Sequence, residues 1–318
     1  MRTKTNSFQL RSRRIALLFL AIVVPILWTQ ATRSAEGRQR QQRRGFPNVD
    51  VQRDIVYKKV DGVSLRLDIY SPKSITHPLP VVLWLHGHRW SRGGKEQHPP
   101  FNLMAQGYIV VSPDYRLSGE ATFPAAIEDC KAAVRWLRAN ASTYHIDPDH
   151  IGAWGHSAGG HLAALLGTSG DVAELDGAGD NLTFSSRVQA VCTMSAPSDI
   201  LQLYETVSSL NEGSARRAKS AVEEFLGGTG EQIKAKAIAA SPTTYVFKDD
   251  AAFLIIHGEN DMSIPVSQSE VFASKLKAAG VDVTLEVAQG RGHGVGAPNY
   301  ADEITSFFDK HLKTGNTH

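Results

Sequence analysis

The chain has 318 residues, 42% of them hydrophobic and 21% charged, which is the balance of one globular domain of generous size or of two small ones. Its formal net charge of +2 includes five positive and no negative charges in residues 1–31, and without that segment the net charge is −3. Neither value points to a nucleic-acid partner. The sequence also has no internal repeat of the length found in solenoid proteins.

The first 31 residues have the layout of an export signal. Five basic residues and no acidic ones precede the uncharged residues 15–28, which would span only about 21 Å as a helix. Because the hydrocarbon core of a membrane is about 30 Å thick, the pattern predicts a signal peptide over residues 1–31, cleaved after Ala31, rather than a stable membrane anchor. A twin-arginine signal and an uncleaved anchor at a lipid surface are the open alternatives. We therefore expect an exported protein, periplasmic or secreted.

Residues 32–50 follow as a polar segment rich in arginine and glutamine, without apolar periodicity. This composition predicts a disordered tether, with binding to an acidic surface as the alternative.

The only two cysteines of the chain, Cys130 and Cys192, come much later and stand in apolar surroundings. Export would permit a disulfide between them, but apolar surroundings favour buried free thiols.

From Asp54 onward the sequence alternates regularly. Two alternating stretches, Asp54–Val60 and Ser64–Ile69, flank Asp61-Gly62, which predicts a β-hairpin. The short apolar runs that predict further strands are Val81–Leu85, Tyr108–Ser112, Ile151–Trp154, Val188–Met194, Phe253–His257 and Val283–Val287. The patterns that predict helices between and after them are Asn102–Gln106, Phe123–Asn140, Ala158–Leu166, Val266–Ala279 and Tyr300–Leu312.

A hairpin followed by alternating strands and helices predicts an α/β fold over residues 51–314, with a mostly parallel central sheet and helices on both of its faces. Residues 199–242 interrupt the alternation, because they are helix-prone with a break at Gly227–Gly230. We interpret them as a small helical insertion or cap over the sheet. Ligands of such sheets bind beyond the carboxyl ends of the strands, so polar residues directly after each strand are candidate site residues.

The most informative motif follows the predicted strand Ile151–Trp154. Gly155-His156-Ser157-Ala158-Gly159 fits the pattern G-x-S-x-G and leads directly into a helical pattern. In this strand–turn–helix setting the turn is so tight that glycine is needed on both sides, and it lifts the serine hydroxyl clear of the sheet. The start of the helix points backbone N–H groups toward developing negative charge. The motif therefore predicts that Ser157 is a nucleophile.

A serine nucleophile needs a histidine base and an acid that orients the base. In this architecture the three residues follow in the order serine, acid, histidine. Asp261 comes just after one predicted strand, and His293 lies in a glycine-rich loop after the next. We therefore predict a triad of Ser157, Asp261 and His293, with Asp199 as the rival acid and Glu259 as a further alternative.

Taken together, these motifs resemble the α/β-hydrolases of the carboxylesterase type. Among these the chain most resembles the BD-FAE-like group, relatives of acetylxylan and feruloyl esterases that neighbour the hormone-sensitive-lipase esterases. The stretches that carry the resemblance are His86-Gly87 with Trp90, "DYRLSGE", "FPAAIEDCKAAVRWLR", "GHSAGGHLA", "HGENDMSIP" and "GRGHG". They cover most of residues 54–312. The resemblance implies an α/β-hydrolase fold and ester hydrolysis that needs no cofactor.

The resemblance also implies an oxyanion hole, built from the backbone N–H groups of His88 and Arg89 together with that of Ala158. Relatives usually have His-Gly-Gly-Gly-Trp in this loop, whereas here His88 and Arg89 replace the second and third glycines. Glycine accepts a positive φ that other residues resist, so we expect an altered loop shape. We hypothesise that Arg89 narrows the acyl side of the pocket and favours small groups such as acetate.

Other residues near this loop admit a second interpretation. His86 and His88 form a close pair that could bind a metal, but a zinc site needs a third ligand, and no carboxylate-plus-histidine run accompanies them. We therefore predict no metal site. Trp90 and His156 are candidates for lining the substrate pocket, although packing is the simpler role for each.

The sequence thus predicts a serine carboxylic-ester hydrolase that works through an acyl-enzyme on short-acyl esters. Acetylated or feruloylated carbohydrate as the substrate follows from the resemblance alone. The alternatives are a serine peptidase of the prolyl-oligopeptidase type and a non-catalytic binding protein on the same fold. A small-molecule or polysaccharide ester is the only partner that we expect.

Overall fold

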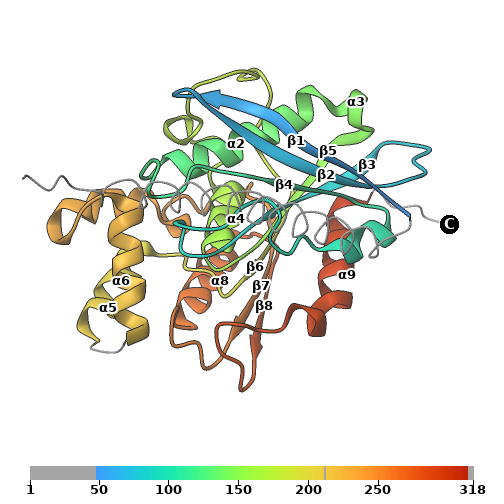
Figure 1. Ribbon diagram of the computed structural model, residues 1–318. Helices are drawn as coiled ribbons and strands as arrows, with labels where there is room; N and C mark the ends of the chain where they lie inside the picture. Colours follow the sequence, from blue (N-terminus) through green and yellow to red (C-terminus); the bar gives the residue numbers. More distant parts are fainter. Residues whose placement is uncertain (1–47, 211–212, 314–318) are drawn as a thin grey trace, which may run out of the picture. The chain divides into compact units, whose positions relative to one another are not determined.

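The computed structural model describes residues 48–210 and 213–313. The predicted signal peptide and all but residues 48–50 of the predicted tether lie outside the described residues. The described residues form one eight-stranded sheet in the order β1-β2-β4-β3-β5-β6-β7-β8 (Figure 1). The strands are β1 (Val49–Val60), β2 (Val63–Pro72), β3 (Leu79–Leu85), β4 (Ile109–Pro113), β5 (Ile146–His156), β6 (Ala190–Met194), β7 (Ala252–Gly258) and β8 (Val283–Ala288).

The directions of the strands confirm the predicted fold class. β2 pairs with β4 antiparallel, and every neighbouring pair from β4 through β8 is parallel. Because a parallel strand needs a crossover to return to the same edge, helices must connect these strands and cover the sheet. All the predicted strands are present, most of them extended by a few residues at their ends.

The first hairpin turns where the sequence predicts it. Asp61 and Gly62 have φ of 49° and 78°, the positive values that a two-residue hairpin turn requires. β1 begins at Val49, two residues before the predicted start of the domain at residue 51. The first six residues of β1 are exposed or half-exposed, so strand pairing rather than burial extends the strand, and apolar periodicity does not reveal it.

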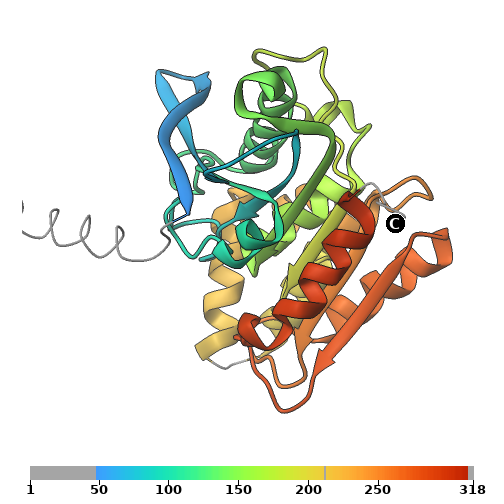
Figure 2. The ribbon, with the colours of Figure 1, turned by 90° about the vertical axis from the view of Figure 1, so that its right-hand side faces the viewer.

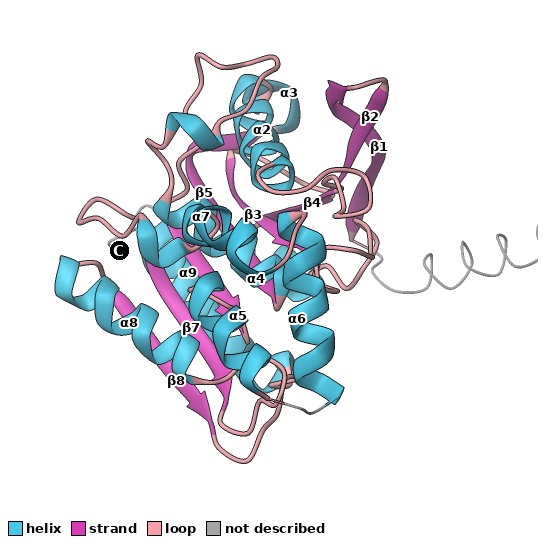
Figure 3. Cartoon of the chain, turned by 90° about the vertical axis from the view of Figure 1, so that its left-hand side faces the viewer, coloured by secondary structure: helices cyan, strands magenta, loops and turns pink. Residues whose placement is uncertain are grey.

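Helices cover both faces of the sheet, as predicted. One face carries α2 (Ala125–Ala139), α4 (Ala158–Thr168) and α8 (Ser267–Ala279), which lie toward the viewer in Figure 3. The opposite face carries α9 (Ala301–Leu312), which lies in front of the strands in Figure 2. The predicted helix at 102–106 is a 3-10 helix, η1 (Phe101–Gln106), that ends at Gly107 with a φ of 82°. None of the described helices is long and apolar enough to cross a membrane.

Residues 199–242, the predicted insertion, are mostly helical. It contains α5 (Ile200–Ser209), α6 (Gly213–Leu226), η3 (Gly230–Ile233) and α7 (Lys234–Ala239), and ends in η4 (Pro242–Thr244). α5 and α6 lie side by side at one side of the domain (Figures 1 and 3). Helix α6 ends at Leu226, and the chain turns at Gly227, where φ is 70°. The insertion lies on the same side of the sheet as α4 and α8 (Figure 3) and belongs to the same compact unit as the sheet.

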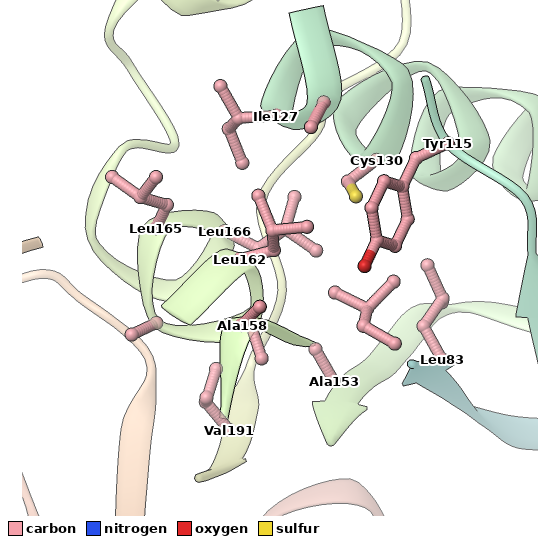
Figure 4. Close-up of a cluster of buried hydrophobic side chains, with 14 of the residues drawn as sticks. Leu83, Tyr115, Ile127, Cys130, Ala153, Ala158, Leu162, Leu165, Leu166 and Val191 are labelled. Carbon is pink, nitrogen blue, oxygen red and sulfur yellow. The ribbon is translucent and has the colours of Figure 1, made fainter. Parts of the chain in front are cut away.

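The core beneath the insertion is built around α4, every residue of which is buried. Leu162, Leu165 and Leu166 belong to a buried cluster that also contains Ile127 of α2 and Val191 of β6 (Figure 4). Fully burying a leucine contributes about 2 kcal/mol, so these three side chains anchor the helix that begins directly after Ser157. Cys130 and Cys192 are buried free thiols, which confirms that prediction.

Candidate active site

Ser157 occupies a strained turn between the end of β5 and the start of α4. Its φ of 56° and ψ of −122° lie in a region that L-residues rarely adopt. A Cβ atom at Gly155 would overlap the backbone of Gly159, and one at Gly159 would overlap the carbonyl oxygen of Leu85. Glycine on both sides of the turn is therefore a steric requirement, and it leaves the serine hydroxyl at the carboxyl edge of the sheet.

The structure brings the three predicted triad residues together. The Ser157 hydroxyl lies 3.0 Å from Nε2 of His293, and Nδ1 of His293 lies 2.7 Å from Oδ2 of Asp261. The three residues are up to 136 positions apart along the chain. They meet because β5, β7 and β8 are parallel strands of one sheet, so that the loops after these strands share one edge.

The Asp261 carboxylate is held on both of its oxygens. Oδ1 accepts hydrogen bonds from the backbone N–H groups of Ser263 (2.8 Å) and Ile264 (3.0 Å), while Oδ2 faces His293 and lies 3.3 Å from Nε2 of His257. Burial raises the pKa of Asp261, but hydrogen bonds from His257 and His293, the charge of His293 and the Ile264 N–H outweigh burial and hold the pKa well below its usual value. An ionised Asp261 keeps the proton of His293 on Nδ1 and leaves Nε2 free to accept the serine proton.

His257 is a residue of this site that sequence reasoning did not single out. Its Nδ1 lies 2.6 Å from Oγ of Ser269, and its Nε2 lies 2.9 Å from the carbonyl oxygen of Ile264. A carbonyl oxygen only accepts, so Nε2 carries the proton and Nδ1 accepts from the serine hydroxyl. The available signal was a histidine at the end of a buried strand, four residues before Asp261.

The two alternative acids have other partners. Asp199 is the N-cap of α5, where its side chain accepts from the backbone N–H of Gln202 at 3.0 Å. Glu259 accepts from the backbone N–H of Gly290 at 2.9 Å. Each carboxylate therefore stabilises a loop or a helix end, and the imidazole of His293 is paired with Asp261 instead.

The loop after β3 has an unusual backbone. His88, Arg89 and Trp90 have φ of 69°, 60° and 57°, which makes three consecutive left-handed residues without a glycine among them. His88 and Arg89 thus adopt a positive φ that residues with a side chain normally resist. The other predicted donor, Ala158, is the first residue of α4, and its N–H has no acceptor within the helix.

A pocket opens above Ser157. Its wall comes from the loop after β3, from the loops after β6 and β7, and from the helical insertion. The lining residues are Arg89, Trp90, Ser157, Ala158, Pro197, Leu203, Ser214, Ala218, Ala221, Val222, Ser263, Ile264 and His293. Apart from Arg89 and His293 these side chains are small, apolar or both, which suits a short apolar group next to the nucleophile.

Of the two predicted pocket residues, Trp90 lines this pocket and His156 does not. The His156 ring lies instead against the ring of His293, with centroids 4.9 Å apart, and its Nε2 donates to the carbonyl oxygen of His293 at 2.8 Å. The side chain of the residue before the nucleophile thus points to the loop that carries the histidine. It supports that loop and is not part of the pocket lining.

His86 and His88, the pair considered as metal ligands, have different surroundings. His86 is buried and stacks on Tyr115 with ring centroids 4.3 Å apart, and burial lowers its pKa to about 4. His88 is exposed. Within the ranges that the structure describes, no three His, Cys, Asp or Glu side chains are grouped as metal ligands.

The strand order and the sharp turn at Ser157 define an α/β-hydrolase. Residues 67–276, more than half of the chain, match the model of the BD-FAE family. The chain belongs to the BD-FAE family.

Relatives and solved structures agree with this family. Esterase LipQ of Mycobacterium tuberculosis is 32% identical over 207 residues, which cover 63% of this chain and 46% of LipQ, so the chain spans about half the length of that curated relative. A truncated carbohydrate esterase from gut microbiota superposes with a TM-score of 0.72 at 29% identity, over 82% of this chain and 95% of that one. The propionate-bound esterase Est2 of the Planctomycetes species Thermogutta terrifontis has a TM-score of 0.67 at 26% identity, over 85% and 97% of the two chains.

Proposed function

We propose that this protein is a carboxylic-ester hydrolase in which Ser157 is the nucleophile, His293 the general base and Asp261 the residue that orients the base. One observation carries the proposal. The hydroxyl, the imidazole and the carboxylate form a continuous row with separations of 3.0 Å and 2.7 Å, and Ser157 and His293 line the pocket. Membership of the BD-FAE family and the likeness to esterases support it.

The proposed reaction has two halves. Oγ of Ser157 attacks the ester carbonyl carbon while Nε2 of His293 takes the hydroxyl proton, and the negative charge moves to the carbonyl oxygen. The backbone N–H groups of Ala158 and of residues 88–89 stabilise that oxygen. His293 then gives its proton to the departing alcohol, which leaves an acyl-serine. A water molecule then attacks the acyl carbon while His293 takes a proton from it. His293 returns this proton to Oγ of Ser157, and the acid is released.

The proposed substrate has a short acyl group, with an acetylated or feruloylated carbohydrate as the natural ester. The likeness to a carbohydrate esterase supports a carbohydrate as the alcohol part of the ester. The likeness to an esterase with bound propionate or butyrate supports a short acyl group. Arg89 lines the pocket, and we propose that its side chain narrows the acyl side. Arg89→Gly should therefore shift the ratio of acetyl to hexanoyl hydrolysis toward the longer chain. An unchanged ratio contradicts this role of Arg89.

The decisive experiment combines a covalent probe with a substrate panel. A fluorophosphonate probe should label the protein starting near Thr32 at Ser157 alone, and should leave Ser157→Ala unlabelled. The same two proteins are assayed on p-nitrophenyl esters, on acetylated xylan and on a chromogenic peptide. Absence of labelling would favour a binding protein, and a preference for the peptide would favour a peptidase; either result overturns the proposal.

We propose in addition that the protein is exported. The basic stretch and the short apolar segment of residues 1–31 support this localisation. Expression of the full chain followed by N-terminal sequencing of the extracytoplasmic fraction should return a chain that begins at Thr32. A full-length chain confined to the cytoplasm would contradict export.

A further inference from the structure

The loop after β3 needs a constraint from outside itself. A left-handed conformation costs an L-residue about 1–2 kcal/mol, and three such residues follow one another at positions 88–90. His88 and Arg89 are exposed, so their side chains offer little packing, whereas the side chain of Trp90 is buried. Trp90 is therefore the residue through which the rest of the fold can hold this turn.

Trp90 is fixed at its backbone and along its ring. Its carbonyl oxygen accepts from the backbone N–H of Ser118 at 2.9 Å and from the Ser118 hydroxyl at 3.2 Å. Its indole stacks on Phe225 of α6, with centroids 4.5 Å apart and planes 15° apart. The indole N–H donates to Nδ1 of His161, in α4, at 3.1 Å.

The chemistry of the two rings decides the protonation of His161. An indole nitrogen can only donate, so Nδ1 of His161 must be unprotonated, and the proton of the neutral ring is on Nε2. Nε2 donates it to the carbonyl oxygen of Ala240, at the end of α7, at 2.7 Å. The ring is fully buried, and burial lowers the pKa of His161 to about 4, so the ring is neutral near pH 7.

One buried imidazole thus connects three parts of the pocket: the loop after β3, the helix that starts at Ser157 and the helical insertion. We propose that His161 is a positioning residue of the oxyanion hole. Through Trp90 it holds the left-handed turn, so that the backbone N–H groups of residues 88–89 face the carbonyl oxygen of the substrate. The inference rests on the proposed function, and we call the row Trp90–His161–Ala240 the clasp.

The clasp is tested with variants that remove one of its hydrogen bonds at a time. Trp90→Phe keeps an aromatic ring against Phe225 but has no N–H, and it should lower kcat on p-nitrophenyl acetate about 10-fold, less than the 10²–10³-fold for a deleted donor. KM should change by less than about twofold, because the hole acts on the transition state rather than on substrate binding.

Two substitutions at His161 separate its two bonds. The amide oxygen of Asn lies near the position of Nδ1 and can accept from Trp90, so His161→Asn should keep kcat within about threefold of the parent. The amide of Gln lies near Nε2 and can reach only Ala240, so His161→Gln should lose as much kcat as Trp90→Phe. Combining Trp90→Phe with His161→Gln should cost no more than either change alone, because both remove the same bond.

Trp84→Phe is the matched control. Trp84 is a second buried tryptophan in the strand that leads into the loop, and its indole N–H donates to the carbonyl oxygen of Gln97 at 2.6 Å. Removing that bond should lower the midpoint of thermal unfolding without changing kcat. An equal loss of kcat in the control, a change in KM alone, or additive losses in the double variant would each overturn the clasp.

The rate of fluorophosphonate labelling separates this inference from the proposed function. Phosphonylation of Ser157 also develops charge on an oxygen in the hole, so the labelling rate of Trp90→Phe should fall about as far as its kcat. If the parent protein takes up no probe and hydrolyses no ester, the proposed function fails and the clasp fails with it. If the parent is active and the clasp variants match it, only the clasp is wrong.

Discussion

The turn at Ser157 and the loop at residues 88–90 both contain non-glycine residues with positive φ, but they are stabilised differently. The turn connects a strand to a fully buried helix, and it has a glycine wherever two backbone segments approach closely. The loop has no glycine at its three left-handed positions, and Trp90 carries its contacts to α4 and α6. A strained backbone can thus be encoded by the local sequence or imposed by distant parts of the fold.

The largest effect is expected at the turn itself. Ser157→Ala removes the hydroxyl while leaving both glycines and the buried helix in place, so kcat should fall by up to about 10⁶-fold with little change in stability. Ester hydrolysis and thermal unfolding measure the two quantities. A variant that keeps more than about a thousandth of the parental kcat would mean that Ser157 is not the nucleophile.

Gly159→Ala tests the steric basis of the turn. The added methyl group would overlap the carbonyl oxygens of Leu85 and His86, so α4 and β3 would have to separate. We expect a loss of about 4 kcal/mol or more in the free energy of unfolding, or no folded protein. Gly119→Ala is the control, since nothing lies within 4 Å of the added Cβ atom there. Equal stability of the two variants would show that the local rule for the turn is wrong.

The pH dependence of stability probes the histidine that holds the loop. The pKa of His161 is about 4 in the folded chain, below the ordinary value of 6.5, so the unfolded chain binds the proton first as the pH falls. The neutral His161 ring contributes roughly 3 kcal/mol to the free energy of unfolding above pH 6.5, and this contribution is lost as the pH falls from 6.5 to 4. Denaturant unfolding at several pH values should show a shallower decline for His161→Asn than for the parent. Parallel declines would contradict the burial of a neutral ring.

The smallest effect is expected for Arg89→Gly, which tests the exposed part of the loop independently of the buried Trp90. Arg89→Gly relieves a φ of 60° at an exposed position, so the free energy of unfolding should rise by up to about 1 kcal/mol. Trp90→Gly relieves a φ of 57° but removes a buried ring, so it should lower stability by about 3–5 kcal/mol. Denaturant titration compares the two variants. A loss of stability in Arg89→Gly would mean that its side chain holds the loop after all.

Most of the site could be placed from the sequence because each candidate followed a recognisable strand. Ser157 stands in a motif with a steric rationale, and Asp261 and His293 follow the two strands at the far edge of a parallel sheet. The histidines that support them could not be assigned in this way. His156, His161 and His257 each bond to a backbone carbonyl, and any residue supplies a carbonyl, so no pattern of side chains reveals the partner.

The periodicity of apolar residues, the glycines at the Ser157 turn and the order serine, acid, histidine are local properties, and they were sufficient for the layers of the fold and for the candidate triad. The course of the loop at residues 88–90 was not predictable in this way. Its three left-handed residues contradict their own local preferences, and contacts with α4 and α6, from residues more than 70 positions away, outweigh that cost. Local rules describe what a segment prefers by itself, whereas packing between distant segments decides which unfavourable conformations the folded chain retains.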